Sequence, residues 1–167
     1  MRILGVDPGI ARTGWGVIRI QNSEFRIQNY GCVETAAGID SSKRLKYIYD
    51  SVVNIIKQHK PDVLAVEELF FNTNAKTAFI VGQARGVILL AASQKNLSIA
   101  TYTPLQVKIA VTGYGRADKS QIGQMIKTIL KLNSIPKPDD VTDALAVALT
   151  HAFSKKMSFL TKKGLIE

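Results

Sequence analysis

Four acidic side chains in this sequence stand where strands and a helix are expected to bring them together. Asp7 and Glu67 each close a short apolar run with the pattern of a strand. Asp140 and Asp143 lie three residues apart at the start of an apolar helical stretch, so they share one face of that helix. Carboxylate oxygens on rigid elements are the ligands that Mg²⁺ prefers. The spacing therefore predicts a magnesium site built from these four acids.

Each acid also has a purely structural interpretation. Asp7 can open the turn made by the Pro-Gly pair that follows it, and Glu67 can be a solvated strand end. The two helix acids can interact favourably with the helix N-terminus, unless Asp139 supplies that cap instead. Glu68 points away from Glu67 because side chains alternate along a strand, so Glu67 is the better candidate for a shared site with Asp7.

The chain is strongly basic outside these acids. Its 22 lysine and arginine residues exceed its 13 acidic residues, which gives a formal net charge of +9 over 167 residues. Such a balance favours a polyanionic partner over a small anionic metabolite, with a merely soluble basic protein as the alternative. An acidic centre in a basic chain indicates metal-assisted cutting of nucleic acid.

Other reactive side chains are sparse. Cys32 is the single cysteine, so there is no disulfide framework and no thiolate zinc site, and we expect a buried, inert thiol. His59 and His151 are expected to be surface or packing residues rather than ligands. The chain begins with a strand rather than a basic leader, and no apolar run is long enough to cross a bilayer. We therefore expect a cytoplasmic protein.

Short β-type runs broken by turn residues open the sequence and predict an antiparallel meander, after which helical and strand periods alternate. The expected strands cover residues 3–6, 16–20, 25–33, 63–67 and 97–102, and the expected helices cover 41–58, 75–95, 104–111, 118–132 and a last stretch from 140. This order predicts one α/β domain over residues 1–153, with a mixed five-stranded sheet and helices on both faces. The basic residues 154–167 form a predicted flexible tail.

Two glycines interrupt the helix expected at residues 75–95. Gly82 and Gly86 lie four residues apart, although glycine in a helix costs about 1 kcal/mol relative to alanine. A Gly-x-x-x-Gly pattern permits close approach of another backbone. Two partners fit this pattern: the sheet beneath the helix, or the same helix of a second copy.

Several motifs, in order along residues 2–153, together resemble the RuvC family of crossover-junction (Holliday-junction) endodeoxyribonucleases. They are Gly5-Val6-Asp7-Pro8-Gly9, Thr13-Gly14-Trp15-Gly16, Val66-Glu67 followed by Phe70, Gly82-Gln83-Ala84-Arg85-Gly86, Gln106-Val107-Lys108, Asp118-Lys119-Ser120-Gln121 and the run from Asp140 to Ala146. The resemblance implies an RNase H-like fold, which agrees with the element order above. It also implies a Mg²⁺-dependent endonuclease that acts as a homodimer on four-way DNA junctions in recombination and repair.

The resemblance places the catalytic and metal-binding acids at Asp7, Glu67, Asp140 and Asp143, and some members of the family carry histidine at the position of Asp140. Two Mg²⁺ ions about 4 Å apart can share the four acids, one activating water and the other stabilising the leaving oxygen. Mn²⁺ is an expected substitute. The implied products carry 5′-phosphate and 3′-hydroxyl ends, and the implied partner is a branch-migration complex of RuvA and RuvB.

Six side chains are candidate DNA contacts. Phe70, which the resemblance favours over Phe71, is placed to stack on unpaired bases. Tyr114 and Arg116 lie in a Gly-rich loop. The remaining three are cations that can bind phosphate: Arg85, Lys108 and Lys119. Core packing for the aromatic residues and surface solvation for the cations are the structural alternatives.

Three other functions stay open at this point. One is an RNase H-like nuclease with a different substrate, and another is a non-catalytic DNA-binding module whose acids are structural. The third is a fragment of an actin-like ATPase, because Asp7-Pro8-Gly9 and Thr13-Gly14-Trp15-Gly16 resemble the first phosphate loop of those enzymes. A chain of 167 residues lacks the second lobe that would close over a nucleotide.

Overall fold

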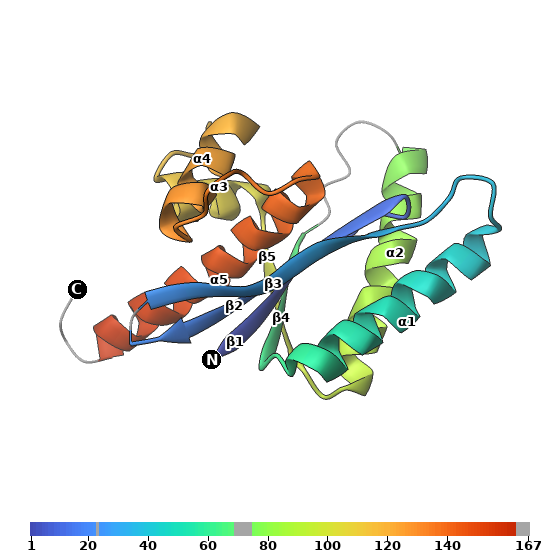
Figure 1. Ribbon diagram of the computed structural model, residues 1–167, viewed down its shortest axis with the longest axis horizontal. Coiled ribbons are helices and arrows are strands. Elements are labelled where there is room, and N and C mark those ends of the chain that lie inside the picture. Colours follow the sequence, from blue (N-terminus) through green and yellow to red (C-terminus); the bar gives the residue numbers. More distant parts are fainter. Residues whose placement is uncertain (23, 69–74, 163–167) are drawn as a thin grey trace.

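The protein is built on a single mixed sheet. The structure, a computed structural model, describes residues 1–22, 24–68 and 75–162 (Figure 1). Five strands pair in the order β3-β2-β1-β4-β5, with β1 antiparallel to β2 and parallel to β4. The strands are β1 (Arg2–Asp7), β2 (Arg12–Gln21), β3 (Glu24–Glu34), β4 (Val63–Glu67) and β5 (Ser98–Tyr102). The predicted meander and the predicted mixed five-stranded sheet are confirmed.

Helices cover both faces of this sheet, as the sequence predicts (Figure 1). One apolar core lies between the sheet and helices α1 and α2, and a second lies between the sheet and helices α3, α4 and α5. The helices are α1 (Ser41–His59), α2 (Ala75–Gln94), α3 (Pro104–Thr112), α4 (Lys119–Ile129) and α5 (Asp139–Lys162). No helix within the described ranges is long and apolar enough to span a bilayer.

Strand alternation decides which side chains face α5. Ile3 belongs to the core on the α5 side of the sheet, whereas Leu4 and Val6 belong to the core on the α1–α2 side. The same alternation places Val63 on the α5 side and Leu64 on the other. Continuing each strand to its carboxyl end therefore directs Asp7 and Glu67 to the α5 face.

Helix α5 packs closely against strands β1 and β2 because glycines line its path. A Cβ atom added to Gly5 would lie 2.1 Å from the carbonyl oxygen of Ala144, and one added to Gly14 would lie 2.0 Å from that of Asp140. Real Cβ atoms do not approach backbone oxygen so closely, so any side chain at either position would push the helix away. This close approach holds the start of α5 beside the end of β1.

The two histidines pack against aromatic residues, in agreement with the sequence. His59 lies against Trp15 with ring centroids 5.6 Å apart. His151 is buried in α5, and its Nδ1 lies 2.7 Å from the hydroxyl of Tyr102. Burial lowers the pKa of His151, with a smaller contribution from the charge of Lys155.

Several element ends differ from the predictions; α4, for example, ends at Ile129 rather than at residue 132. β2 begins at Arg12 rather than residue 16, because the glycines that lower its strand propensity are accommodated against α5. α5 continues to Lys162, beyond the predicted end of the domain at residue 153, and the division of the chain there, with a flexible tail after it, stays a prediction. Asp139 is the first residue of α5 rather than its cap, and its carboxylate pairs with Lys137 at 2.6 Å.

The packing of α2 shows whether the face that carries Gly86 lies against the sheet. Ala84, Ile88 and Ala91 are fully buried and pack in the core on the α1–α2 side. Gly86 lies on the exposed face, and a Cβ added there would meet no described atom within 4 Å. The side of α2 that carries Gly86 therefore does not pack against the molecule's own sheet.

Candidate active site

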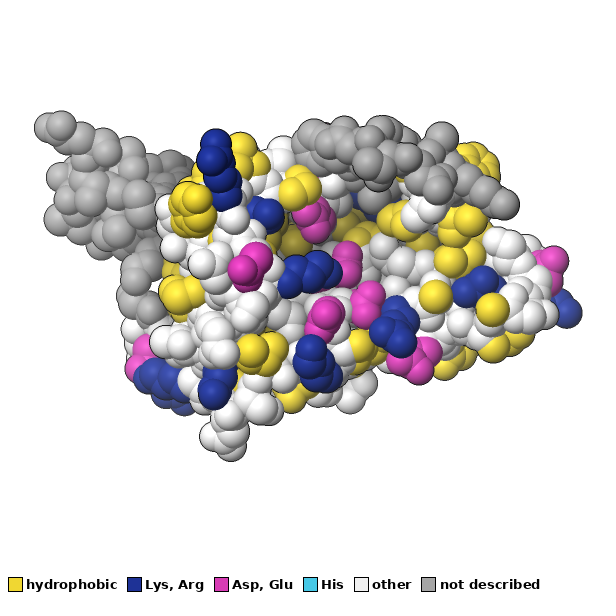
Figure 2. Space-filling view, turned by 90° about the horizontal axis from the view of Figure 1, so that it is seen from above, with side chains coloured by type: hydrophobic (Ala, Val, Ile, Leu, Met, Phe, Trp, Pro, Cys, Tyr) yellow, Lys and Arg dark blue, Asp and Glu magenta, His cyan; other side chains and the backbone are white. Residues whose placement is uncertain are grey.

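The four predicted acids gather at one end of the sheet. Val6 pairs with Val66 in the parallel register of β1 and β4, so Asp7 and Glu67 end adjacent strands at the same edge. Asp140 and Asp143 approach this edge from the first turns of α5. The face seen in Figure 2 shows acidic side chains near the middle of the molecule with lysine and arginine side chains around them.

Asp7 is the most strongly perturbed of these acids. Burial, followed by repulsion from Asp143, Asp140 and Glu67, raises its pKa to about 7, and the positive charge of Lys119 only partly opposes this. In the metal-free protein, Asp7 therefore holds a proton over much of the range in which an ordinary aspartate is ionised. A carboxyl group in this state is one that a cation would readily ionise.

The pKa of Glu67 is raised by the same causes, but less strongly than that of Asp7. Burial raises its pKa most, the charge of Asp143 raises it further, and Lys119 and Lys108 lower it. The interaction with Asp143 shows that the strand end and the helix start are electrostatically coupled across the site. Ionisation of both strand-end carboxylates is therefore unfavourable, and additional positive charge nearby would favour it.

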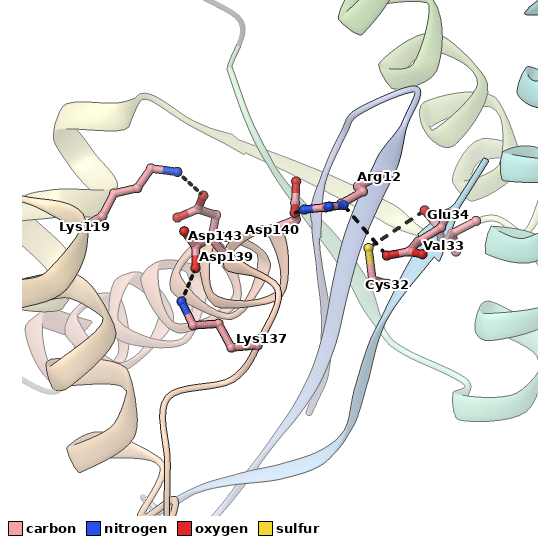
Figure 3. Close-up of polar contacts among 9 residues, drawn as sticks. All are labelled: Arg12, Cys32, Val33, Glu34, Lys119, Lys137, Asp139, Asp140 and Asp143. Atoms are coloured by element: carbon pink, nitrogen blue, oxygen red, sulfur yellow. Dashed lines mark hydrogen bonds and ion pairs between the residues drawn. The ribbon is translucent and has the colours of Figure 1, made fainter. Parts of the chain in front are cut away.

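Two cations flank the acids on opposite sides, as the close-up shows (Figure 3). Lys119 Nζ donates to Asp143 Oδ2 at 3.1 Å, and this pairing raises the pKa of Lys119. Arg12 Nη1 lies 3.9 Å from Asp140 Oδ2, and its Nε lies 3.8 Å from Glu34 Oε1. Lys119 is the first residue of α4 and lies within its capping box, in which the side chains of Asp118 and Gln121 each accept from the other residue's backbone N–H.

The donor set suits a hard divalent cation. It consists of carboxylate oxygens alone, on two strand ends and one helix, and Asp7 bears the repulsion that such an ion would remove. Within the described part of the chain, no three acidic, histidine or cysteine side chains already form a compact metal-binding group. The acids therefore fit a metal by chemistry and position, and their carboxylates would move closer together when the metal binds.

The predicted DNA contacts are distributed unevenly around this site. Lys108 lines a groove of about 410 Å³ together with Glu67, Lys119 and Asp143. Arg85 also lies at the site, where its Nε donates to the backbone oxygen of Glu67 at 3.3 Å. This bond uses one of its donors to brace the end of β4.

Tyr114 and Arg116 are exposed on the loop between α3 and α4, and the side chain of Tyr114 is 55% accessible. Both side chains are available for contact with a large partner, while the backbone of Tyr114 bonds to the hydroxyl of Thr112 and the N–H of Ala117 within the loop. Phe70 lies outside the described residues. Its role as a DNA contact stays a prediction.

Comparison with known protein families identifies the family of this chain. A family model described as "Crossover junction endodeoxyribonuclease RuvC" matches residues 3–151. The chain belongs to the RuvC family. Its described residues form the RNase H-like sheet that the family resemblance implies.

Individual RuvC proteins extend this similarity over nearly the whole chain. The RuvC of Caldicellulosiruptor saccharolyticus is 57% identical over 155 residues, which cover 92% of this chain and 93% of that protein. The RuvC of Halothermothrix orenii is 56% identical over 158 residues, which cover 95% and 96%. The structure of Thermus thermophilus RuvC in complex with a Holliday junction substrate matches with a TM-score of 0.90 at 36% identity, covering 95% of this chain and 96% of that one.

Sequence reasoning found the four acids of this RuvC-family chain but missed Arg12. Arg12 begins β2 directly after a turn, where the sequence has no periodic signal, and its ion pairs depend on the approach of β3 and α5. Cys32 lies nearby and is half-buried, and burial together with the charges of Asp140 and Glu34 raises its pKa. The raised pKa agrees with the predicted inertness of the thiol, whereas the thiol is less buried than predicted.

Proposed function

We propose that this protein is a crossover-junction endodeoxyribonuclease that nicks two opposed strands of a four-way DNA junction during recombination and repair. The observation that carries the proposal is the convergence of Asp7, Glu67, Asp140 and Asp143 at one edge of an RNase H-like sheet in a chain of net charge +9. Membership of the RuvC family supports the same substrate class.

The four acids would hold two Mg²⁺ ions, with Mn²⁺ as a substitute, and the ions would supply Lewis acidity for the ionisation of water and for the charge on the leaving oxygen. The chain's own residues orient the DNA. Lys119 and Lys108 line the same groove as Glu67 and Asp143, where they would bind the phosphate backbone beside the acids. Hydrolysis in this arrangement yields 5′-phosphate and 3′-hydroxyl ends.

We further propose that two copies pair through the exposed face of α2. Phe79 and Leu90 are 67% and 50% accessible there, and Gly86 lies between them at helical spacing. Large apolar side chains on either side of an open glycine suit the close packing of two helices. A two-fold dimer presents two equivalent sites, which matches two equivalent strands of a junction.

The branch-migration complex of RuvA and RuvB stays a predicted partner, and it rests on the family alone. A test of the main proposal does not need it, because nicking of a synthetic junction requires only the protein and a divalent metal. Junction recognition and strand cutting can therefore be measured on the purified chain.

A substrate panel tests the proposed function. The purified protein is incubated in Mg²⁺ with a labelled four-way junction, a linear duplex, an RNA–DNA hybrid and a single strand of matching sequence. We expect cuts at symmetric positions on two opposed junction strands, and nicks that DNA ligase seals without prior treatment. Equal cutting of the hybrid or duplex would indicate another RNase H-like nuclease. Junction binding without any nick would indicate a DNA-binding module, and heat stabilisation by nucleotide would favour the ATPase alternative.

A further inference from the structure

Arg12 lies across the acid cluster from Lys119 (Figure 3). It begins β2, directly after the turn that follows Asp7, and its side chain is 56% accessible. Its nearest acidic partners are Asp140 and Glu34, at 3.9 and 3.8 Å. Both distances exceed the 2.7–3.2 Å typical of a hydrogen bond, so these are loose ion pairs.

Loose and exposed ion pairs add little to the stability of a fold. Water screens the attraction between such charges, and the side chains of Arg12 and Glu34 are both more than half exposed. Two carboxylates at this range keep the guanidinium beside the acids without using its planar pair of donors at hydrogen-bond distance. That pair of donors matches the geometry of a phosphate group.

The backbone on either side of Arg12 is held by hydrogen bonds. The buried hydroxyl of Thr13 donates to the backbone oxygen of Gly9 at 2.7 Å. On the other side, the backbone N–H of Thr35 donates to the backbone oxygen of Ala11 at 3.0 Å. Arg12 therefore projects from a fixed backbone, which reduces the ordering cost of binding.

An open groove of about 540 Å³ runs beside this turn. Its volume lies within the usual range for ligand sites, roughly 300–1,000 Å³. The groove has an apolar wall and a polar end at the acid cluster. The wall includes Ile10, Ala11, Ile80 and Val81, and the polar end includes Arg12 and Asp140.

The groove lined by Lys108 and Lys119 (the Lys119 groove) and the groove beside Arg12 (the Arg12 groove) border different acids of the cluster and share no lining residue. The Lys119 groove includes Glu67 and Asp143, whereas the Arg12 groove includes Asp140. A strand whose phosphate lies over the acids would therefore enter through one groove and leave through the other. Lys108 and Lys119 serve the backbone on the first side, and Arg12 is the cation on the second.

We propose that the Arg12 groove is a binding subsite for the nucleotide next to the scissile phosphate, with Arg12 gripping that nucleotide's own phosphate in a bidentate contact. The apolar wall takes the sugar and base. Arg12 is thus a positioning residue, because it orients the strand across the acids without touching the reacting atoms. The assignment rests on the proposed nuclease function and adds a strand path to it.

The test compares Arg12→Gln and Arg12→Lys with the control Arg26→Gln. Arg26 is also an exposed arginine in an ion pair, with Glu24 at 3.0 Å, but it lies at the other end of the β2–β3 pairing. In Ca²⁺, where binding can be measured apart from cutting, we expect Arg12→Gln to lower the slope of log affinity against log salt by about 1. We expect Arg12→Lys to keep the slope, since the charge stays, and Arg26→Gln to match wild type.

Neutral methylphosphonate groups, placed singly at each phosphate flanking the cut, identify the contact. At one flanking position the substitution should slow the cutting of a junction in Mg²⁺ by wild-type protein about tenfold or more, and should slow Arg12→Gln no further. Arg12→Lys should cut at an intermediate rate, because an ammonium group cannot form the bidentate contact. Circular dichroism melts of each variant check folding.

Two results would overturn the subsite. One is an Arg12→Gln protein that cuts and binds as Arg26→Gln does. The other is an Arg12→Gln protein that every methylphosphonate slows by the same factor as it slows wild type. Arg12 would then act on something other than a flanking phosphate. If the wild-type protein cuts no junction at all, the nuclease proposal fails instead, and the salt slopes in Ca²⁺ still report separately on Arg12.

Discussion

Asp7 is the residue at which burial and the charges of three other carboxylates act together. Asp7→Asn keeps the size of the side chain but removes its negative charge. We expect junction cutting in Mg²⁺ to fall to the level of a reaction without enzyme, while junction affinity in Ca²⁺ stays within about twofold of wild type, since the basic contacts remain. Asp50→Asn in α1 is the matched control, because Asp50 is an exposed acid paired with Lys46. Near-normal cutting by a folded Asp7→Asn protein would exclude the metal site.

The raised pKa of Asp7 also predicts how stability depends on pH. Its value of about 7 in the folded protein exceeds the ordinary 3.8, so the folded state binds the extra proton. The resulting contribution to stability is complete below pH 4 and is lost as pH rises through 7. In EDTA, the melting temperature of wild type relative to Asp7→Asn should therefore fall between pH 5 and pH 8.

Added Mg²⁺ should reverse this loss, and it should raise the wild-type melting temperature more at pH 8 than at pH 5. Differential scanning fluorimetry over a pH series measures both effects. A difference between wild type and Asp7→Asn that stays constant from pH 5 to pH 8 would contradict the electrostatic account of the site.

Lys119 contributes at the residue scale in a different way. Its ammonium group pairs with Asp143 and remains largely exposed, so it is placed to exchange that partner for a phosphate. Lys119→Ala should flatten the salt dependence of junction binding by about one unit of slope. Lys46→Ala is the control, because Lys46 is equally exposed and also paired with an acid, but lies in α1 beyond the opposite face of the sheet. Identical slopes for the two variants would make Lys119 an ordinary surface lysine.

At the scale of elements, the seam between α5 and the first two strands sets the geometry of the site. Gly14→Ala would bring a methyl group against the backbone of α5 at Asp140. We expect a loss of about 3 kcal/mol or more in the free energy of unfolding, because a backbone cannot yield as a flexible side chain does. Gly38→Ala is the control, since a Cβ there would meet nothing within 4 Å. Urea denaturation compares the two, and equal stabilities would refute the close seam.

The elements themselves were largely predictable, because apolar periods of two and of about 3.6 residues mark them directly. The start of β2 was not, because Gly14 and Gly16 have low strand propensity and their packing against α5 is invisible in local sequence. The acids of the site were predictable because strand ends and helix starts are local features. Arg12 was not, because an arginine next to a turn looks like any solvated surface residue until α5 is placed beside it.

At the scale of the whole molecule, the exposed side of α2 allows dimerisation to be tested without disturbing the fold of the monomer. Gly86→Leu should leave the monomer folded and slightly more stable, because leucine favours a helix by about 0.8 kcal/mol over glycine and finds open space there. Dimerisation should be impaired, since the branched side chain keeps paired helices apart. Sedimentation at micromolar concentration and circular dichroism measure the two properties on the same sample. A wild-type protein that stays monomeric on junction DNA would contradict the dimer.

Helix α5 determines at which stage of synthesis the chain has all four candidate acids. It supplies Asp140 and Asp143 to the candidate site and much of the core on its side of the sheet, including Val141, Leu145 and Leu149. Of the described elements it is also the last to leave the ribosome. A nascent or prematurely terminated chain that stops before residue 139 has neither two of its four acids nor the helix that covers the sheet. We therefore expect such an unfinished product to lack cutting activity, because two of the four candidate acids and the helix that completes this core are synthesised together.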